Sequence, residues 1–89
     1  MLFMIQYKTS TGTHRAGEER FKQTGGAPPP AGVKKIGGYH YADGSGGFTL
    51  CETDDPVALA KWAHQWTDIL VFDGRPVLTD EQIGQVLGG

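Results

Sequence analysis

Hydrophobic positions recur along the chain with two spacings, one typical of strands and one typical of helices. Short apolar runs bounded by glycine, proline and small polar residues predict strands over residues 2–8, 33–42, 47–53 and 69–78. Residues 13–24 form a weaker helical segment. Leu59, Trp62, Ala63 and Trp66 follow an i, i+3, i+4, i+7 spacing, which predicts one apolar face of a second helix.

Capping signals mark where these helices begin and end. Asp55 before Pro56 places an N-cap acid next to a proline at the first helical position. Gly25 and the prolines at 28–30 end the first helix. Thr79 and Gln82 form a capping box, which predicts a short terminal helix carrying Ile83, Val86 and Leu87.

Turn residues predict how the strands are joined. The loop at residues 43–46, Asp-Gly-Ser-Gly, connects two strand-type runs and predicts a β-hairpin. Gly37 and Gly38 inside the first of these runs indicate a bulge or a close approach by another group. Pro76 lacks a backbone donor, so its strand should end at a sheet edge or protrude.

The predicted order is β-α-β-β-α-β plus a short C-terminal helix, an α+β, ferredoxin-like fold formed by one domain over residues 1–89. Right-handed crossovers place both main helices on one face of the sheet. The strands nevertheless carry apolar groups on both faces, as Met4 and Ile5 illustrate. We therefore expect a homodimer in which two sheets meet face to face, a homodimeric α/β barrel.

Composition narrows the function classes. Cys51 is the only cysteine, and the three histidines have no zinc-like spacing, so neither a disulfide nor a metal site is expected. The net charge of −2 comes without a basic stripe, which disfavours nucleic acid as a partner. The sequence shows no membrane-length apolar run and no signal peptide, which favours a cytoplasmic location. We expect no cofactor, because no motif implies one.

His40 is the leading candidate for catalysis. It lies between Tyr39 and Tyr41 in a predicted strand that we place near the sheet centre. Imidazole titrates near neutral pH, so His40 could act as a general acid or base on a bound phenol or ketone. The alternative is a solvent-facing or hydrogen-bonded histidine without a catalytic role.

Aromatic residues are candidates for substrate binding. Tyr7, Tyr39, Tyr41, Trp62 and Trp66 could line a pocket for a planar molecule. The alternative for the two tryptophans is core packing, because they share the helix face that must cover the sheet.

Arg75 is a candidate for binding a carboxylate of a ligand or of the partner subunit. Asp73 lies two residues earlier on the same strand face, so a local ion pair is the alternative. We expect Cys51 to be a buried structural thiol, His14 to begin a helix, and His64 to be solvated on a helix.

Four segments carry a resemblance to known proteins: MLFMIQYK, APPPAGVKKIGGYH, DGSGGFTLCETDDP and WTDILVFDGRPVL. The chain resembles the dimeric α/β-barrel superfamily and, within it, the small bacterial family named domain of unknown function 3303. The resemblance implies a two-sheet barrel dimer with helices outside. A relative in prodigiosin-type pigment biosynthesis implies roles beside specialised metabolism, and the superfamily spans several activities, so fold alone assigns none.

Two function classes remain open. The first is a cofactor-independent enzyme or tailoring auxiliary that acts on an aromatic or polyketide-like small molecule, with His40 as acid or base. The second is a non-catalytic dimeric module that binds a ligand or a partner through the same pocket.

Overall fold

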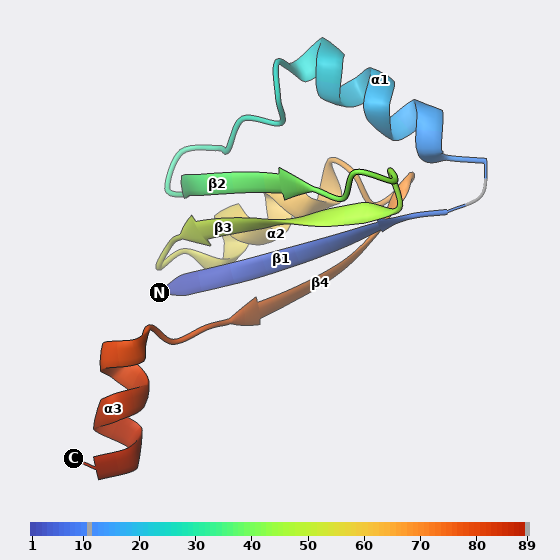
Figure 1. Cartoon of the computed structure of the whole chain (residues 1–89). Helices are drawn as coiled ribbons and strands as arrows, with labels where there is room; N and C mark the ends of the chain where they lie inside the picture. Colours follow the sequence, from blue (N-terminus) through green and yellow to red (C-terminus); the bar gives the residue numbers. More distant parts are fainter. Residues whose placement is uncertain (11, 89) are drawn as a thin grey trace.

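A four-stranded antiparallel sheet and three helices make up the computed structural model, which describes residues 1–10 and 12–88 (Figure 1). The elements in chain order are β1 (Leu2–Thr9), α1 (His14–Thr24), β2 (Lys34–His40), β3 (Gly46–Glu52), α2 (Pro56–His64), β4 (Leu70–Pro76) and α3 (Asp80–Gly88). The α+β, ferredoxin-like fold expected from the sequence is therefore confirmed.

The sheet has the strand order β2-β3-β1-β4, so β1 and β3 are central. Residues of β1 pair with β3 on one side, where Ile5 lies opposite Thr49, and with β4 on the other, where Tyr7 lies opposite Phe72. The expectation that His40 lies near the sheet centre is wrong, because β2 is an edge strand and His40 is its last residue. The position of His40 in the sheet depends on the order of the strands, and the sequence of a single strand does not determine that order.

The predicted caps form the helix ends. The Asp55 carboxylate accepts hydrogen bonds from the backbone N–H groups of Val57 and Ala58, both at 3.1 Å. Gly25 ends α1 in the left-handed conformation, at φ 75°. At α3, the Thr79 N–H donates to Gln82 Oε1 at 2.9 Å and the Gln82 N–H donates to Thr79 Oγ1 at 3.2 Å.

The turn predictions are also confirmed. Asp43 accepts hydrogen bonds from the N–H and the hydroxyl of Ser45, which closes the β2–β3 hairpin. The register of β2 against β3 shifts between Lys35 and Gly37, which is the expected bulge. Strand β4 ends at Pro76 on the sheet edge.

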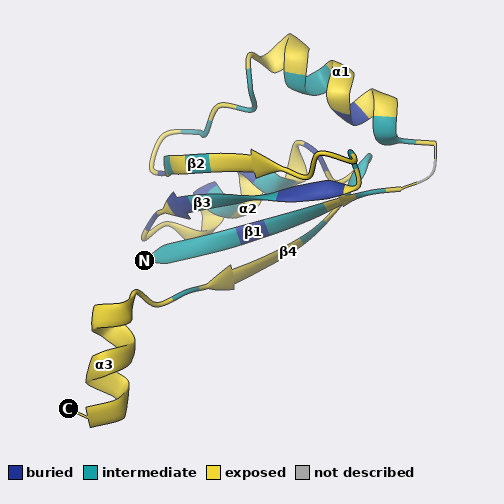
Figure 2. Ribbon diagram, in the orientation of Figure 1, coloured by how far each residue is buried: buried dark blue, intermediate teal, exposed yellow. Residues whose placement is uncertain are grey.

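The hydrophobic core lies between the sheet and α2 (Figure 2). Its buried members are Ile5, Val33, Cys51, Ala58 and Trp62. Burial raises the pKa of the Cys51 thiol, so it stays protonated at neutral pH and behaves as a small apolar group. Helix α2 ends at His64, so Trp66 lies in the following turn instead of on the helix, yet it is buried.

Helix α1 covers the same face of the sheet but packs less closely. Gly17 is its buried residue, and a Cβ at that position would lie 3.6 Å from Leu70 Cδ2. Arg20 ties α1 to the turn after α2 through two hydrogen bonds to the Asp68 carboxylate, at 2.7 and 2.8 Å, and a third to the Gln65 carbonyl at 2.8 Å. The Arg20 hydrogen bonds lower the pKa of Asp68.

The second face of the sheet carries apolar side chains that none of the helices in the described part of the chain covers. The register places Met4, Phe48, Leu50 and Val71 on this face, together with polar residues such as Gln6 and Asp73. Strand β1 therefore points apolar side chains to both faces of the sheet, as the sequence indicates. We refer to this surface as the open face.

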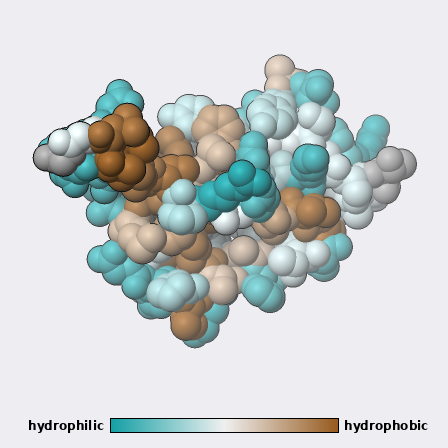
Figure 3. Space-filling view, turned by 90° about the horizontal axis from the view of Figure 1, so that it is seen from below, coloured by the Kyte–Doolittle hydropathy of each residue, from teal (hydrophilic) through white to brown (hydrophobic). Residues whose placement is uncertain are grey.

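Helix α3 lies apart from the rest of the molecule (Figures 1 and 2). Its residues 80–88 are exposed, including Ile83, Val86 and Leu87 at 41, 68 and 79 %. Figure 3 shows hydrophobic surface at the end of the molecule where α3 lies. Among the described residues, no helix is long and apolar enough to cross a membrane.

Candidate functional site

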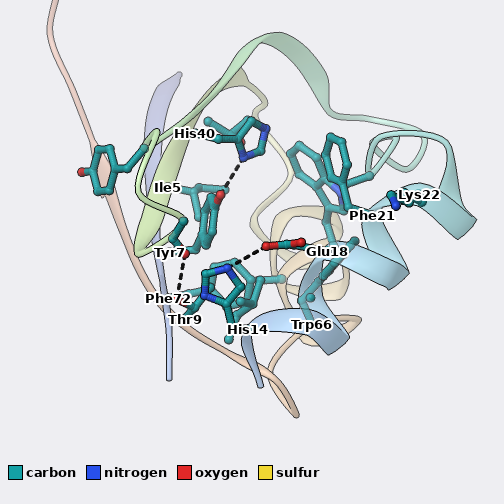
Figure 4. Close-up of a pocket in the computed structure, with 18 of the residues that line it drawn as sticks. Ile5, Tyr7, Thr9, His14, Glu18, Phe21, Lys22, His40, Trp66 and Phe72 are labelled. Carbon is teal, nitrogen blue, oxygen red and sulfur yellow. Dashed lines mark hydrogen bonds and ion pairs between the residues drawn. The ribbon is translucent and has the colours of Figure 1, made fainter. Parts of the chain in front are cut away.

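A pocket of about 450 Å³ lies between the sheet and the two covering helices (Figure 4). This volume lies within the range of small-molecule sites. The pocket exists because α1 stands away from the sheet while α2 fills the core. Its lining comes from every element except α3: Ile5, Tyr7, Thr9, His14, Gly17, Glu18, Phe21, Lys22, Ala27, His40, Tyr41, Ala42, Gly44, Thr49, Trp62, Ala63, Trp66, Leu70 and Phe72.

Tyr7 and His40 form a hydrogen-bonded pair in this pocket. The Tyr7 hydroxyl lies 2.6 Å from His40 Nδ1, and the Phe21 ring meets the His40 imidazole edge-on at a centroid distance of 5.1 Å. No described residue hydrogen-bonds the second ring nitrogen, Nε2. Because a hydroxyl donates or accepts, the pair accommodates either neutral tautomer of His40, and Nε2 can present a proton or a lone pair.

Gly47 makes this position of Tyr7 possible. It lies directly opposite Tyr7 in the β1–β3 register, and a Cβ there would lie 2.7 Å from Tyr7 Cε1. The glycine-rich hairpin therefore does more than turn the chain, because it leaves the space that the Tyr7 ring occupies.

Burial raises the pKa of Tyr7, and the charge of ionised Tyr41 raises it further. The phenol is therefore protonated at neutral pH and keeps its O–H as a donor. When His40 carries its proton on Nδ1 and donates it to the Tyr7 oxygen, the Tyr7 O–H is free to donate to a ligand oxygen, and Nε2 is free to accept a proton.

A second polar pair, His14 and Glu18, lines the same pocket from α1. His14 Nε2 lies 2.6 Å from Glu18 Oε1, one helical turn away. Because a carboxylate only accepts, Nε2 carries the proton and Nδ1 of neutral His14 carries a lone pair. The His14 ring also lies against the hairpin, since a Cβ at Gly44 would lie 2.7 Å from Nε2.

Most of the aromatic residues that we proposed from the sequence lie together. Tyr7, His40, Tyr41, Trp62 and Trp66 all line the pocket. The two tryptophans are also buried, each 6 % exposed, so they serve both as core and as pocket wall.

Tyr39 and Arg75 lie elsewhere. Tyr39 is 52 % exposed and stacks on Phe48 at 5.0 Å, on the open face. Arg75 is also on the open face and donates to Asp73 at 2.9 Å, which is the local ion pair weighed as its alternative. Strand alternation explains why Tyr39 lies outside the pocket. Neighbouring residues in a strand point to opposite faces, and of Tyr39 and His40 it is His40 that points toward the helices.

Sequence reasoning missed His14, Glu18 and Phe21 as pocket residues. Their spacing of three and four residues places them on one side of α1, which is a signal that the sequence contains. The sequence does not show that this side of α1 lies over Tyr7 and His40. Residues 1–10 and 12–88 contain no cluster of three or more His, Cys, Asp or Glu side chains that could hold a metal ion.

Comparison with known proteins identifies a family. The sequence model of a family described as "Domain of unknown function (DUF3303)" matches residues 1–89. No curated protein and no solved structure matches the chain.

The raised pKa of Tyr7 gives a testable prediction. Absorbance at about 295 nm reports tyrosinate, so the difference between the titrations of the wild type and Tyr7→Phe isolates Tyr7. We expect the midpoint of this difference to lie above the ordinary value of about 10, because burial disfavours the phenolate. Circular dichroism at each pH checks that both proteins are folded. A midpoint below about 10 would contradict the burial argument.

Proposed function

Because the chain belongs to the DUF3303 family, whose description carries no activity, we propose a function from the geometry of its pocket. The protein binds an aromatic or polyketide-like small molecule between α1 and the sheet, and His40 with Tyr7 transfers a proton to or from it. The observation that carries this proposal is the 2.6 Å Tyr7–His40 hydrogen bond inside a pocket walled by aromatic side chains.

The walls favour a flat, mostly apolar ligand. Phe21, Trp62, Trp66 and Phe72 contribute aromatic surface, and Ile5 and Leu70 contribute aliphatic surface. Aromatic side chains offer large contact areas to a planar ring. The pocket also opens to solvent at His40, which is exposed, so a ligand can reach the pair.

The polar pair favours proton transfer next to an oxygen. In the tautomer with the proton on Nδ1, His40 Nε2 is a base, while the protonated Tyr7 donates a hydrogen bond to a ligand carbonyl. Removal of a proton from the carbon beside that carbonyl creates an enolate, and the Tyr7 donor stabilises its oxygen. The same pair in reverse returns the proton, so no metal or organic cofactor is needed for this step.

We infer that the open face is covered by a second copy of the chain. Ten of the residues in 1–10 and 12–88 are buried, and three of these ten are glycines without a side chain, so the core is small for a chain of 89 residues. A second sheet would cover Met4, Phe48, Leu50 and Val71 with matching apolar surface in a two-fold arrangement. The pocket lies on the opposite face, so such a dimer leaves both pockets accessible.

Proton transfer is tested with 2-tetralone, an enolisable aromatic ketone, in deuterated buffer. We expect the protein to accelerate deuterium incorporation at the carbons beside the carbonyl, measured by mass spectrometry. His40→Ala should lower the catalysed rate about 100-fold or more, because general acid–base catalysis contributes about 10²–10⁴.

Binding of 2-tetralone, measured by calorimetry, separates the two function classes. His40→Ala should bind within a fewfold of the wild type, and His64→Ala, which removes an exposed histidine of α2, should change neither binding nor rate. Binding without any catalysed exchange would instead support the non-catalytic module. Exchange that survives His40→Ala would show that His40 is not the base.

The dimer is tested by light scattering at micromolar concentration. We expect the wild type to be a dimer and Leu50→Asp to be monomeric, because the change buries a carboxylate among apolar side chains of the proposed interface. Val57→Asp makes the same kind of change on the outer side of α2, where Val57 is 61 % exposed, and should remain dimeric. A monomeric wild type would contradict the inference.

A further inference from the structure

The pocket presents hydrogen-bonding groups from two separate elements. The Tyr7–His40 pair belongs to the sheet, whereas the His14–Glu18 pair belongs to the first two turns of α1. Figure 4 shows both pairs bordering the same space, with Phe21 and Trp66 along its other side. A ligand that fills this space meets polar groups at two edges and apolar groups between them.

Contacts with Glu18 and Gly44 restrict the His14 side chain before any ligand binds. The Glu18 carboxylate bonds Nε2, and the backbone of Gly44 lies against the ring, leaving no room for a Cβ. The Thr9 hydroxyl in turn donates to the Gly44 carbonyl at 3.0 Å, which fixes the hairpin against β1. A side chain whose rotamer is restricted in this way binds a partner with less loss of conformational entropy.

The tautomer of His14 defines what it recognises. Since Nε2 donates to the carboxylate, Nδ1 of the neutral ring accepts, and no described residue occupies it. A ligand hydroxyl is the group that satisfies such an acceptor. The Tyr7–His40 pair accommodates a carbonyl or a hydroxyl, because each of its two groups can donate or accept.

We propose that the pocket selects flat aromatic molecules with oxygen substituents at two separate edges, one bonded by the Tyr7–His40 pair and the other, a hydroxyl, bonded by His14. Dihydroxy- and hydroxyketo-aromatic compounds belong to this class. The proposal rests on the proposed function, because it assigns a ligand class to the same pocket. It adds His14 as a binding residue, with Glu18 as the residue that positions it.

The test compares the binding of probes with no, one or two hydroxyl groups, measured by isothermal calorimetry: naphthalene, 2-naphthol, and the 1,5-, 2,6- and 2,7-dihydroxynaphthalenes. The best dihydroxy isomer should bind about three- to tenfold more tightly than 2-naphthol, since one added hydrogen bond contributes that much to an equilibrium constant. 2-Naphthol should in turn bind more tightly than naphthalene.

Variants assign the second hydroxyl to His14. His14→Leu should reduce the dihydroxy isomer to the affinity of 2-naphthol while leaving 2-naphthol itself unchanged, and Glu18→Gln should remove part of the same advantage. Matched controls are His64→Leu and Glu19→Gln, both at exposed positions outside the pocket, which should change nothing. Thermal unfolding confirms that each variant is folded.

The outcomes separate this inference from the proposed function. If no probe binds, the proposed function fails. If 2-naphthol binds but no dihydroxy isomer binds more tightly, only the two-edge recognition fails, and this comparison needs no variant. If His14→Leu weakens 2-naphthol and the dihydroxy isomer equally, the role of His14 is general packing, which also overturns the inference.

Discussion

The pocket depends on one constraint, which is the separation between α1 and the sheet. A bare glycine, Gly17, is the residue that α1 buries, and the Arg20–Asp68 pair fixes the helix to the turn after α2. Arg20 also lies over the Trp66 ring, 5.8 Å from its centroid. Because α2 alone fills the core, the space beneath α1 remains open to a ligand.

Two glycines also leave the space in which polar side chains of the pocket lie. Gly47 leaves room for the Tyr7 ring, and Gly44 leaves room for the His14 ring. Both lie in or beside the β2–β3 hairpin, and each meets a pocket residue from a different element. The hairpin thus places Tyr7 and His14 on the same cavity although they are on different elements, which is how a chain of this size can gather several polar groups around one ligand.

The sequence predicts the architecture well, because each element has a strong local signal. The Asp55-Pro56 cap, the Thr79–Gln82 box and the glycine-rich hairpin depend on residues within a few positions of each other, and all three form as expected. The site is predicted less completely. Local patterns group Tyr39 with His40 although strand alternation separates them, and they indicate for His14 only the start of a helix. The contacts that define the site join residues far apart in the chain, such as Arg20 and Asp68, and local patterns do not contain such contacts.

The central claim is that the space beneath α1 is a ligand site, and native mass spectrometry of protein purified gently from its own host tests it most directly. Ala63→Phe fills the pocket from α2, whereas Ala60→Phe places the same ring on the exposed side of that helix. We predict a reproducible added mass on the wild type and on Ala60→Phe, and none on Ala63→Phe. An added mass that Ala63→Phe retains would contradict the account, because the ligand would then occupy another part of the protein.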